Sequence, residues 1–389
     1  MVTKYLNFET ITQIVFLSTV NINTKRAYAI TIKNTMSAVK NLGINTTLIA
    51  PDAETLTSKL EQSKRIKFWS YLQRYARSQF NLPRSIISPL YFILFEVSFL
   101  VTLRLVNAIN GKNTIWTRSL LAPLILGKNH RYLIEIHQPL SKRQIFLLFV
   151  YTRLQFSMIV APISRYLYHQ LESSRLPIES AVLLPMAITD DFLRDNYYAF
   201  KDKYDIGYFG SLRMNGNNQG IFMFIEQLII CKTFNPKFKC VIVGFSESEI
   251  KELCDFFFPF ELLQNWITFY PRLEHYRLPQ MLQECRYLVL PYKDDDFNAA
   301  RHPLKAFEYA ASGRPILASN TRGHRNIFDD SEVFFYEHQD RLSLQKLLFS
   351  LENEFGLSIP DKSRNARRKA LEQTYRRRAL MALSKLDKL

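Results

Sequence analysis

The feature that most constrains the fold is an alternation, met twice along the chain, of short apolar runs with longer stretches of helical character. Continuous apolar runs are typical of parallel strands that are buried on both faces of a sheet. Parallel strands also need a crossover connection, which is usually a helix. The pattern therefore predicts an α/β protein with two parallel sheets in tandem.

The predicted strands fall into two series, separated by a polar, charged stretch at residues 189–204 that we interpret as a linker. The first series is 13–17, 46–50, 114–117, 132–136, 158–161 and 181–184. The second series is 206–209, 238–243, 266–269, 287–290 and 315–318. Such sheets bind ligands at the carboxyl ends of their strands. We therefore expect two Rossmann-like domains that face each other across a cleft.

The domain boundaries follow from the linker. We expect a first domain at 1–190, a second at 205–360, and a basic amphipathic helix over 361–389 that crosses back to the first domain. A membrane span needs about 20 apolar residues with few charges. The most apolar stretch, 86–106, is interrupted by Pro89, Glu96 and Arg104. It indicates a buried or interfacial helix instead of a span.

The charge of the chain is uneven. Residues 1–190 carry 22 basic and 9 acidic side chains, so most of the net charge of +16 lies there. This excess favours an anionic partner, namely a membrane surface, a nucleic acid or a phosphorylated substrate, and charge alone does not choose among them. No helix-turn-helix, zinc-finger or aromatic RNA-binding motif is present, so we expect no nucleic-acid partner.

Residues 64–77 mix basic and aromatic side chains at roughly helical spacing. Such a helix can lie among the headgroups of an anionic membrane, with Lys64, Arg65, Lys67 and Trp69 as its contacts. A basic helix packed on its own domain is the alternative. The cysteines form no CxxC pair and no secretory signal is visible, which favours a cytoplasmic protein. Together with the helix at 64–77, this predicts a protein that is peripheral at the inner face of the membrane.

The most informative local pattern lies in residues 301–319. Pro303 suits the first turn of a helix, where its missing N–H would be unbonded, and Gly313 is placed to end that helix. The free N–H groups near residues 300–304 then form a positive helix end suited to phosphate. Lys305 and Glu308 share a face, and Glu308 is placed to accept hydrogen bonds from a ribose. A surface ion pair between the two is the alternative.

This segment resembles the donor-binding signature of glycosyltransferases with the GT-B fold, in the variant SPLKxFEYMAxGxPI of the retaining family 4-like group, with His302 in place of serine. Further segments resemble motifs of that family in the same order along almost the whole chain. They are 116–119, 135–139, 160–165, 207–212, 241–244 and 278–292. The resemblance implies that the first domain binds the acceptor and the second binds a nucleoside-diphosphate sugar.

The resemblance also implies roles for single residues. Glu308 would hold the ribose, and residues 298–304 would cradle the diphosphate with backbone amides. His137 would touch the donor sugar, so that His137 and Glu308 form the catalytic set. Arg118 would face the acceptor, with a salt bridge that holds the fold as the alternative. The implied donor-binding residues are Gly210, Ser211, Arg213, Asn298, His302, Pro303, Leu304, Lys305 and Glu308.

The chain departs from the family pattern around the donor. Ala300 stands where the fuller signature has a first glutamate, so the backbone or the acidic residues 294–296 would hold the sugar hydroxyls. Ser211 and Gln219 stand where the family commonly has an arginine and a lysine on the diphosphate, and Arg213 is the nearest substitute. The loop at 18–26 also lacks the glycines that usually lie close to the donor.

The implied function is transfer of a sugar from a UDP- or GDP-sugar to a glycan or lipid-linked acceptor, with retention, in surface polysaccharide or glycoconjugate synthesis. No cofactor is expected. No metal is expected either, because this fold binds phosphate through backbone amides and helix ends. The three aspartates at 294–296 follow a predicted strand, and a cation site there is the alternative. A non-catalytic nucleotide- or glycan-binding protein that kept the fold is the alternative.

Overall fold

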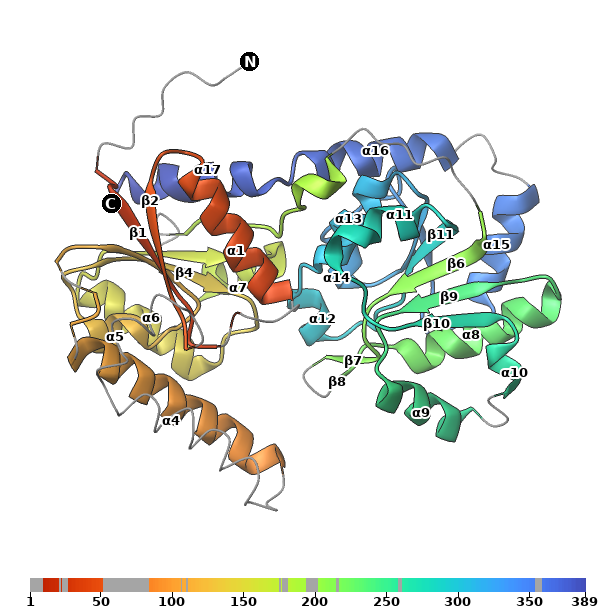
Figure 1. Cartoon of the computed structure of the whole chain (residues 1–389), viewed down its shortest axis with the longest axis horizontal. Helices are drawn as coiled ribbons and strands as arrows, with labels where there is room; N and C mark the ends of the chain where they lie inside the picture. The colour runs from red at the N-terminus through yellow and green to blue at the C-terminus, as the bar shows by residue number, and fades with distance from the viewer. Residues whose placement is uncertain are drawn as a thin grey trace. The chain divides into compact units, whose positions relative to one another are not determined.

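The computed structural model describes residues 10–20, 22, 27–51, 84–105, 107–109, 111–174, 176, 181–193, 202–214, 217–257, 261–353 and 359–389. The chain divides into two compact units. Unit 1 comprises residues 1–163, 167–184 and 378–389, and unit 2 comprises 164–166 and 185–377. Each unit contains one fully parallel main sheet with helices between the strands, as the sequence predicts (Figure 1).

The sheet of unit 1 has the strand order β2-β1-β3-β4-β5. Its strands are β1 (Gln13–Leu17), β2 (Asn45–Ile49), β3 (Thr114–Thr117), β4 (Arg131–Ile136) and β5 (Met158–Pro162). The helices between them are α1 (Ala27–Lys40), α4 (Arg84–Leu105), α5 (Ala122–Leu126) and α6 (Lys142–Arg153), and α7 (Arg165–Ser173) follows β5. Every residue of β3 and β5 is buried, which explains why these strands are continuous apolar runs.

The sixth strand predicted for this unit, at 181–184, is wrong. The segment makes only an isolated bridge between Ala181 and Val160. Val182 N and Leu184 N donate to the carbonyls of Val160 and Pro162 at 3.0 and 2.9 Å. Because Pro162 has no N–H to donate in return, the ladder stays one-sided.

The main sheet of unit 2 has the strand order β10-β9-β6-β11-β12-β13. Its strands are β6 (Tyr204–Phe209), β9 (Cys240–Val243), β10 (Ile267–Tyr270), β11 (Cys285–Leu290), β12 (Ile316–Ser319) and β13 (Phe334–Tyr336). A small hairpin pairs β7 (Arg213–Met214) with β8 (Asn217–Asn218). The sequence predicted all of the main strands except β13, whose three residues are too few to show a pattern.

The helices of unit 2 connect these strands and pack on both faces of the sheet (Figure 1). The α-helices are α8 (Ile221–Phe234), α9 (Glu247–Phe256), α10 (Glu261–Gln264), α11 (Leu278–Leu282), α12 (Asp296–Ala300), α13 (Leu304–Ser312), α14 (Arg322–Arg325), α15 (Ser343–Asn353) and α16 (Ile359–Leu371). The described residues of the unit also form two 3-10 turns, η2 (Asp190–Phe192) and η3 (His275–Arg277).

The strand order of unit 2 places a switch point between β6 and β11. β6 pairs with β9 on one side and with β11 on the other, so the chain leaves the two strands in opposite directions. Ligands of such sheets bind at the carboxyl ends of the strands at this point. Gly210 follows β6 and Pro291 follows β11. We therefore expect a ligand-binding site among the residues around them.

The tail does not form one helix, as the sequence predicted, but two. α16 ends at Leu371, and α17 spans Tyr375–Leu386. Thr374 Oγ1 accepts a hydrogen bond from Arg377 N at 3.1 Å and so caps the second helix. The two helices belong largely to different units: α16 lies in unit 2, whereas residues 378–389 of α17 and the end of the chain lie in unit 1.

Within the ranges that the structure describes, no helix is long and apolar enough to cross a membrane. α4 covers most of the helix predicted at 86–106. In its second half Leu100 and Leu103 are buried in unit 1, whereas Val101 and Leu105 are exposed. The helix therefore packs along one face and leaves apolar side chains on the other.

Candidate functional site

The segment with the strongest sequence signal forms α13 and the turn before it. The helix begins at Leu304, and Pro303 lies in the N-cap position, just before the first turn in which it was predicted. Gly313 ends the helix with a φ of 73°, as predicted, in the left-handed region that favours glycine. All residues of α13 except Lys305 are buried. The helix shares one hydrophobic core with side chains of β11 and α16.

The carboxylate of Glu308 is held by a histidine from another element. Its Oε1 lies 2.5 Å from Nε2 of His275, in η3, and the side chain of Glu308 is 8% exposed. Burial lowers the pKa of His275, but the adjacent Glu308 outweighs burial and raises it. Oε2 of Glu308 accepts no hydrogen bond from the described residues. One oxygen is thus fixed, and the other is available to a ligand.

Lys305 does not pair with Glu308. Its Nζ lies 3.3 Å from the hydroxyl of Tyr208, and it lies over the rings of Tyr208 and Tyr292 at 4.6 and 5.3 Å from their centroids. Burial lowers the pKa of this ammonium. A Cβ on Gly210 would overlap Nζ, so the absence of a side chain there lets Lys305 reach the carboxyl end of β6.

The loop that leads into α13 is fixed by its own side chains. Asn298 Nδ2 donates to the carbonyl of Lys293 at 3.1 Å. Nδ1 of His302 accepts from Met186 N at 3.1 Å, and its ring stacks on Phe307 with centroids 4.6 Å apart. Asn298 and His302 therefore hold the loop in place at the start of the helix.

The other residues implied for the donor site have partners on the protein. Ser211 Oγ donates to the carbonyl of Arg213 at 2.9 Å. Nε of Arg213 lies 3.0 and 3.1 Å from the two carboxylate oxygens of Glu252. This pairing directs the guanidinium of Arg213 to α9 and the carboxylate there.

The acidic residues 294–296 are also engaged. Arg322 bridges Asp294 and Asp296 at 3.0 and 3.1 Å, and Asp295 accepts from Asn298 N at 2.7 Å. Among the described residues, no group of three or more His, Cys, Asp or Glu side chains is arranged to hold a metal ion.

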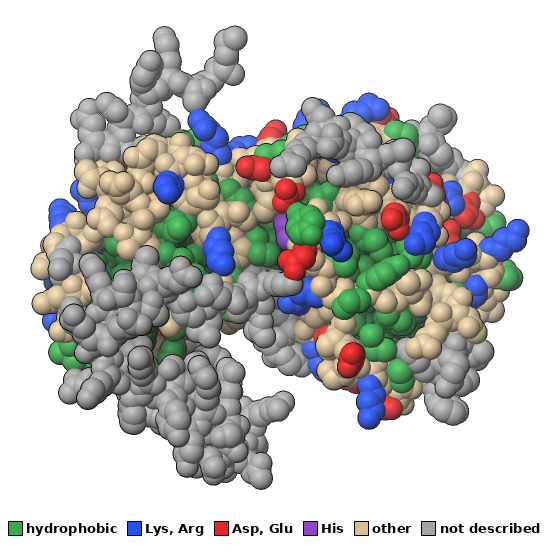
Figure 2. All heavy atoms as spheres, viewed as in Figure 1, with side chains coloured by type: hydrophobic (Ala, Val, Ile, Leu, Met, Phe, Trp, Pro, Cys, Tyr) green, Lys and Arg blue, Asp and Glu red, His purple; other side chains and the backbone are tan. Residues whose placement is uncertain are grey.

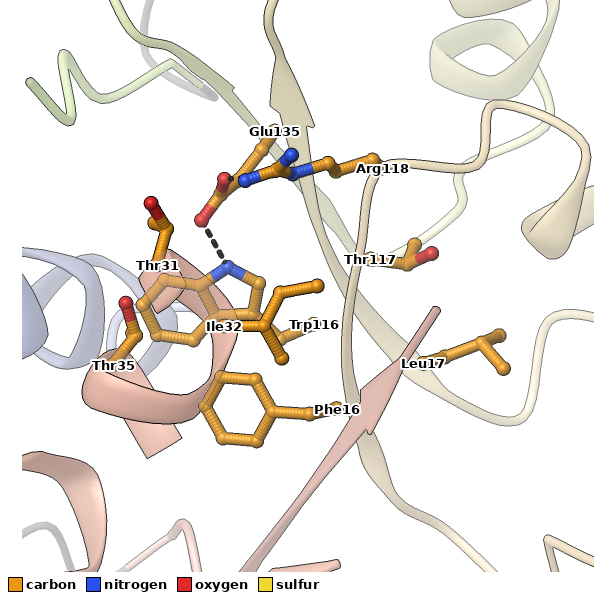
Figure 3. A pocket seen from close by; sticks show the side chains of 9 residues that line it. All are labelled: Phe16, Leu17, Thr31, Ile32, Thr35, Trp116, Thr117, Arg118 and Glu135. Carbon is orange, nitrogen blue, oxygen red and sulfur yellow. Dashed lines mark hydrogen bonds and ion pairs between the residues drawn. The ribbon is translucent and has the colours of Figure 1, made fainter. Parts of the chain in front are cut away.

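In unit 1, four side chains converge on the buried carboxylate of Glu135. Figure 3 shows two of them, Trp116 and Arg118, beside that carboxylate. Trp116 Nε1 and Arg378 Nη2 each donate to Oε1 at 2.6 Å. His137 Nε2 lies 2.6 Å from Oε2, and Arg118 Nε lies 3.5 Å from it. Burial raises the pKa of Glu135, but Arg378 and the other donors outweigh it and hold that pKa well below its ordinary value. Glu135 is therefore an anion at neutral pH.

The same cluster sets the state of His137. Burial and the nearby guanidinium of Arg118 lower the pKa of His137 to about 4, although Glu135 acts in the opposite direction. The ring is thus neutral near pH 7. Because Glu135 only accepts, Nε2 carries the proton, and Nδ1 is left as an acceptor. His137 remains 20% exposed and can meet a ligand.

Arg118 takes part in this cluster and is 29% exposed, so the salt bridge that was the alternative role for this residue is present. A cavity of about 20 Å³, roughly the room that one water needs, lies beside it. Figure 3 shows Thr31 and Thr35 of α1 on the far side of Trp116 from Arg118. The predicted membrane contacts Lys64, Arg65, Lys67 and Trp69 lie outside the described residues.

Three residues that bond to these two carboxylates were not predicted from the sequence. His275 and Arg378 reach Glu308 and Glu135 from 33 and 243 positions away, and no local spacing relates such residues. Trp116 lies in a segment that the resemblance covers, but its bond to Glu135 needs the pairing of β3 with β4.

The chain is similar to known proteins in part of its sequence and in its fold. Residues 203–350 match the family model described as glycosyl transferases group 1. No curated protein matches the chain in sequence. Among solved structures, HepE of Anabaena in complex with UDP and glucose is similar with a TM-score of 0.64 and 13% identity, covering 97% of this chain and 100% of HepE.

Two further structures show the same fold. Sucrose-phosphate synthase from Thermosynechococcus elongatus has a TM-score of 0.62 and 14% identity over 95% of this chain and 97% of its own. The N-terminal domain of Candida albicans trehalose-6-phosphate phosphatase has a TM-score of 0.70 and 12% identity over 96% of each chain. At these identities the likeness establishes the fold. Residues 203–350 thus resemble the glycosyl transferases group 1 family, and the chain has the GT-B fold.

Proposed function

We propose that the chain transfers a sugar from a nucleoside-diphosphate sugar, linked to UDP or GDP, to a hydroxyl of a glycan or lipid-linked acceptor. The observation that carries this proposal is Glu308 in the matched domain. Its Oε1 is fixed by His275, and its Oε2 makes no hydrogen bond to the described residues. A carboxylate prepared in this way can accept both hydroxyls of a ribose through one oxygen.

The turn before α13 supports the placement of the diphosphate. The first N–H groups of a helix have no partner within the helix, and they favour anions. The turn is held rigid by Asn298 and His302, so these amides are in place before a ligand arrives. The similarity to HepE, which was solved with UDP and glucose, agrees with a nucleotide-sugar donor.

The transfer itself would proceed with retention and without a metal ion. The acceptor oxygen bonds to the anomeric carbon while the bond from that carbon to the diphosphate oxygen breaks. The acceptor proton passes to the leaving diphosphate, whose charge is stabilised by donors already in position. His137 in unit 1 would accept a hydrogen bond from a sugar hydroxyl at Nδ1, since Glu135 takes the proton on Nε2.

The proposal is tested by offering a panel of UDP- and GDP-sugars with cell membranes as acceptor and measuring the nucleotide released. We expect one donor to be consumed, and Glu308→Gln to abolish consumption. Glu352→Gln is the matched control, because Glu352, on α15, is 48% exposed and pairs with Arg286 of β11. Binding of a nucleotide without consumption of any sugar would favour the non-catalytic alternative.

We further propose that the enzyme works at the inner membrane face, on a surface polysaccharide or glycoconjugate. Lys142, Phe146, Phe149 and Arg153 recur at helical spacing on one exposed side of α6, and Arg153 lies over the ring of Phe149 at 5.2 Å. Aromatic and basic side chains on one side of a helix suit the headgroup region.

Flotation with anionic vesicles tests the membrane proposal. We expect binding that weakens with salt and falls when Phe146 and Phe149 become Ser, or when Lys64, Arg65 and Lys67 become Glu. Binding to neutral and anionic vesicles alike, or no loss in either variant, would contradict it.

A further inference from the structure

Arg301 lies at the switch point of unit 2 with one edge of its guanidinium unused. Nη1 donates to Gln219 Oε1 at 2.9 Å and to Asn298 Oδ1 at 3.1 Å. The group lies over the rings of Tyr292 and Phe297, at 5.0 and 5.4 Å from their centroids. Nε and Nη2 donate no hydrogen bond within the described part of the chain. These two nitrogens form the edge that binds carboxylates and phosphates bidentately.

The contact from Gln219 is directional. This side chain is 1% exposed, and its Nε2 donates to the carbonyl of Ser211 at 3.2 Å. The amide nitrogen is therefore committed, and Oε1 must point to Arg301. A buried amide with both ends bonded holds the guanidinium in one orientation before a ligand binds.

Arg301 and Lys305 also share an aromatic contact and an electrostatic property. Both lie over the ring of Tyr292, and among the described residues each donates only to neutral oxygens. Their positive charges act on each other, and Arg301 adds to the effect of burial in lowering the pKa of Lys305. Two partly buried cations side by side are unfavourable unless an anion joins them.

Three other cations of unit 2 are neutralised on the protein. Arg314 pairs with Asp202 at 2.8 Å, Lys369 with Glu332 at 2.7 Å, and Arg322 with two aspartates. Figure 2 shows acidic and basic side chains interspersed on the visible face of this unit. Arg301 and Lys305, in contrast, make no ion pair with the described residues, and their combined charge matches a dianion.

We propose that Arg301, held in place by Gln219, and Lys305 form a clamp for the diphosphate of the donor. The Nε and Nη2 edge of Arg301 takes two phosphate oxygens, and Lys305 takes another as a point charge. This inference rests on the proposed function only in naming the diphosphate as that of a nucleotide sugar. In the resembling family, cations commonly stand at the positions of Ser211 and Gln219. Here Gln219 supports a cation that comes from the β11 side of the switch point instead.

The clamp is tested by calorimetric titration of the full chain with inorganic pyrophosphate, UDP, GDP and the matching nucleosides. We expect Arg301→Gln to weaken binding of pyrophosphate and of the preferred nucleotide by about 10- to 100-fold, the range for a hydrogen bond to a charged group. Binding of the nucleoside should not change. Arg301→Lys should fall between, because an ammonium cannot bind bidentately.

Two further variants separate position from charge. Gln219→Glu places a carboxylate against Nη1 and should weaken pyrophosphate binding although Arg301 is intact. Arg286→Gln, at the opposite end of β11, removes one charge from an exposed pair with Glu352 and should change nothing. Equal losses in Arg286→Gln and Arg301→Gln would show a general charge effect and overturn the clamp.

The clamp and the proposed function can fail separately. If the wild-type chain transfers sugar while folded Arg301→Gln and Arg301→Lys keep full pyrophosphate affinity, the clamp is wrong and the function stands. If pyrophosphate binds in an Arg301-dependent manner but no nucleotide sugar is consumed, the clamp stands and the function is wrong. Failure of the wild-type chain to bind pyrophosphate or either nucleotide overturns the clamp.

Discussion

Arg378 donates to the carboxylate of Glu135 at 2.6 Å across 243 positions of sequence, and the two side chains are only 2% and 5% exposed. Removal of one partner from a buried ion pair leaves an uncompensated charge, which is far costlier than loss of an exposed pair. The bond therefore makes a tail residue part of the core of unit 1.

Replacement of Arg378 by Ala should lower the free energy of unfolding by about 3–5 kcal/mol, the range for a broken buried pair. Arg377→Ala is the matched control, because Arg377 is 52% exposed in its pair with Glu372 and should cost less than about 1 kcal/mol. Urea unfolding followed by tryptophan fluorescence measures both. Equal losses in the two variants would show that burial of the pair is unimportant.

The low pKa of His137 predicts a dependence of stability on pH. Because burial and Arg118 lower this pKa to about 4, the unfolded chain binds the proton first as pH falls. The contribution to stability is complete above about 6.5 and is lost as pH falls toward 4. His137→Gln cannot titrate, and its unfolding free energy should fall less steeply over this window, by up to about 1.4 kcal/mol per pH unit. An NMR titration of the His137 ring with a midpoint near 6.5 would contradict this.

His275 should affect donor binding through Glu308, without touching the reacting atoms. His275→Leu removes the donor that fixes Oε1 and should raise the KM for the nucleotide sugar about 10-fold or more, with a smaller change in kcat. His275→Gln keeps an N–H donor and should recover part of the loss. Steady-state kinetics separate the two parameters. A fall in kcat at constant KM would instead place His275 in the chemical step.

The glycines at positive φ should differ in their tolerance of a side chain. Gly313 has a φ of 73°, and its nearest neighbour to an added Cβ is Arg367 at 3.7 Å, so Gly313→Ala should cost about 1–2 kcal/mol for backbone conformation alone. Gly220 has a φ of 95°, and a Cβ there would lie 2.7 Å from the carbonyl oxygen of Pro291. Gly220→Ala should therefore lower the melting temperature much more. Similar melting temperatures would contradict this difference.

The sequence predicted the strands well because buried parallel strands are continuous apolar runs, and β1 and β3 begin and end where the runs do. The prediction failed where the extent of a strand or helix depends on a segment that it contacts. The segment at 181–184 is apolar enough for a strand, but its pairing depends on Pro162 of β5. The break in the tail at Thr374 likewise depends on a cap and on a bridge to Ile188, which amphipathic spacing does not contain.

The sites divide in the same way. From helical spacing and the caps of α13, the sequence predicts that Lys305 and Glu308 share a face of the helix. It does not predict which residues they contact. Lys305 lies on Tyr208, and Glu308 is held by His275, because strands and turns far apart in the chain meet at the switch point. Side chains that act through such contacts carry no local signature, and only the folded unit identifies them.

The division of the tail determines which pieces of the protein can be made separately. A fragment that stops at Leu184 contains the whole sheet of unit 1 yet lacks Ala379, Ala382, Leu383 and Leu386, all fully buried in it. Such a fragment would expose apolar surface and should aggregate unless residues 378–389 are supplied, either as a peptide or by fusion through a linker. Removal of residues 378–389 from the chain should, for the same reason, destabilise unit 1 more than unit 2.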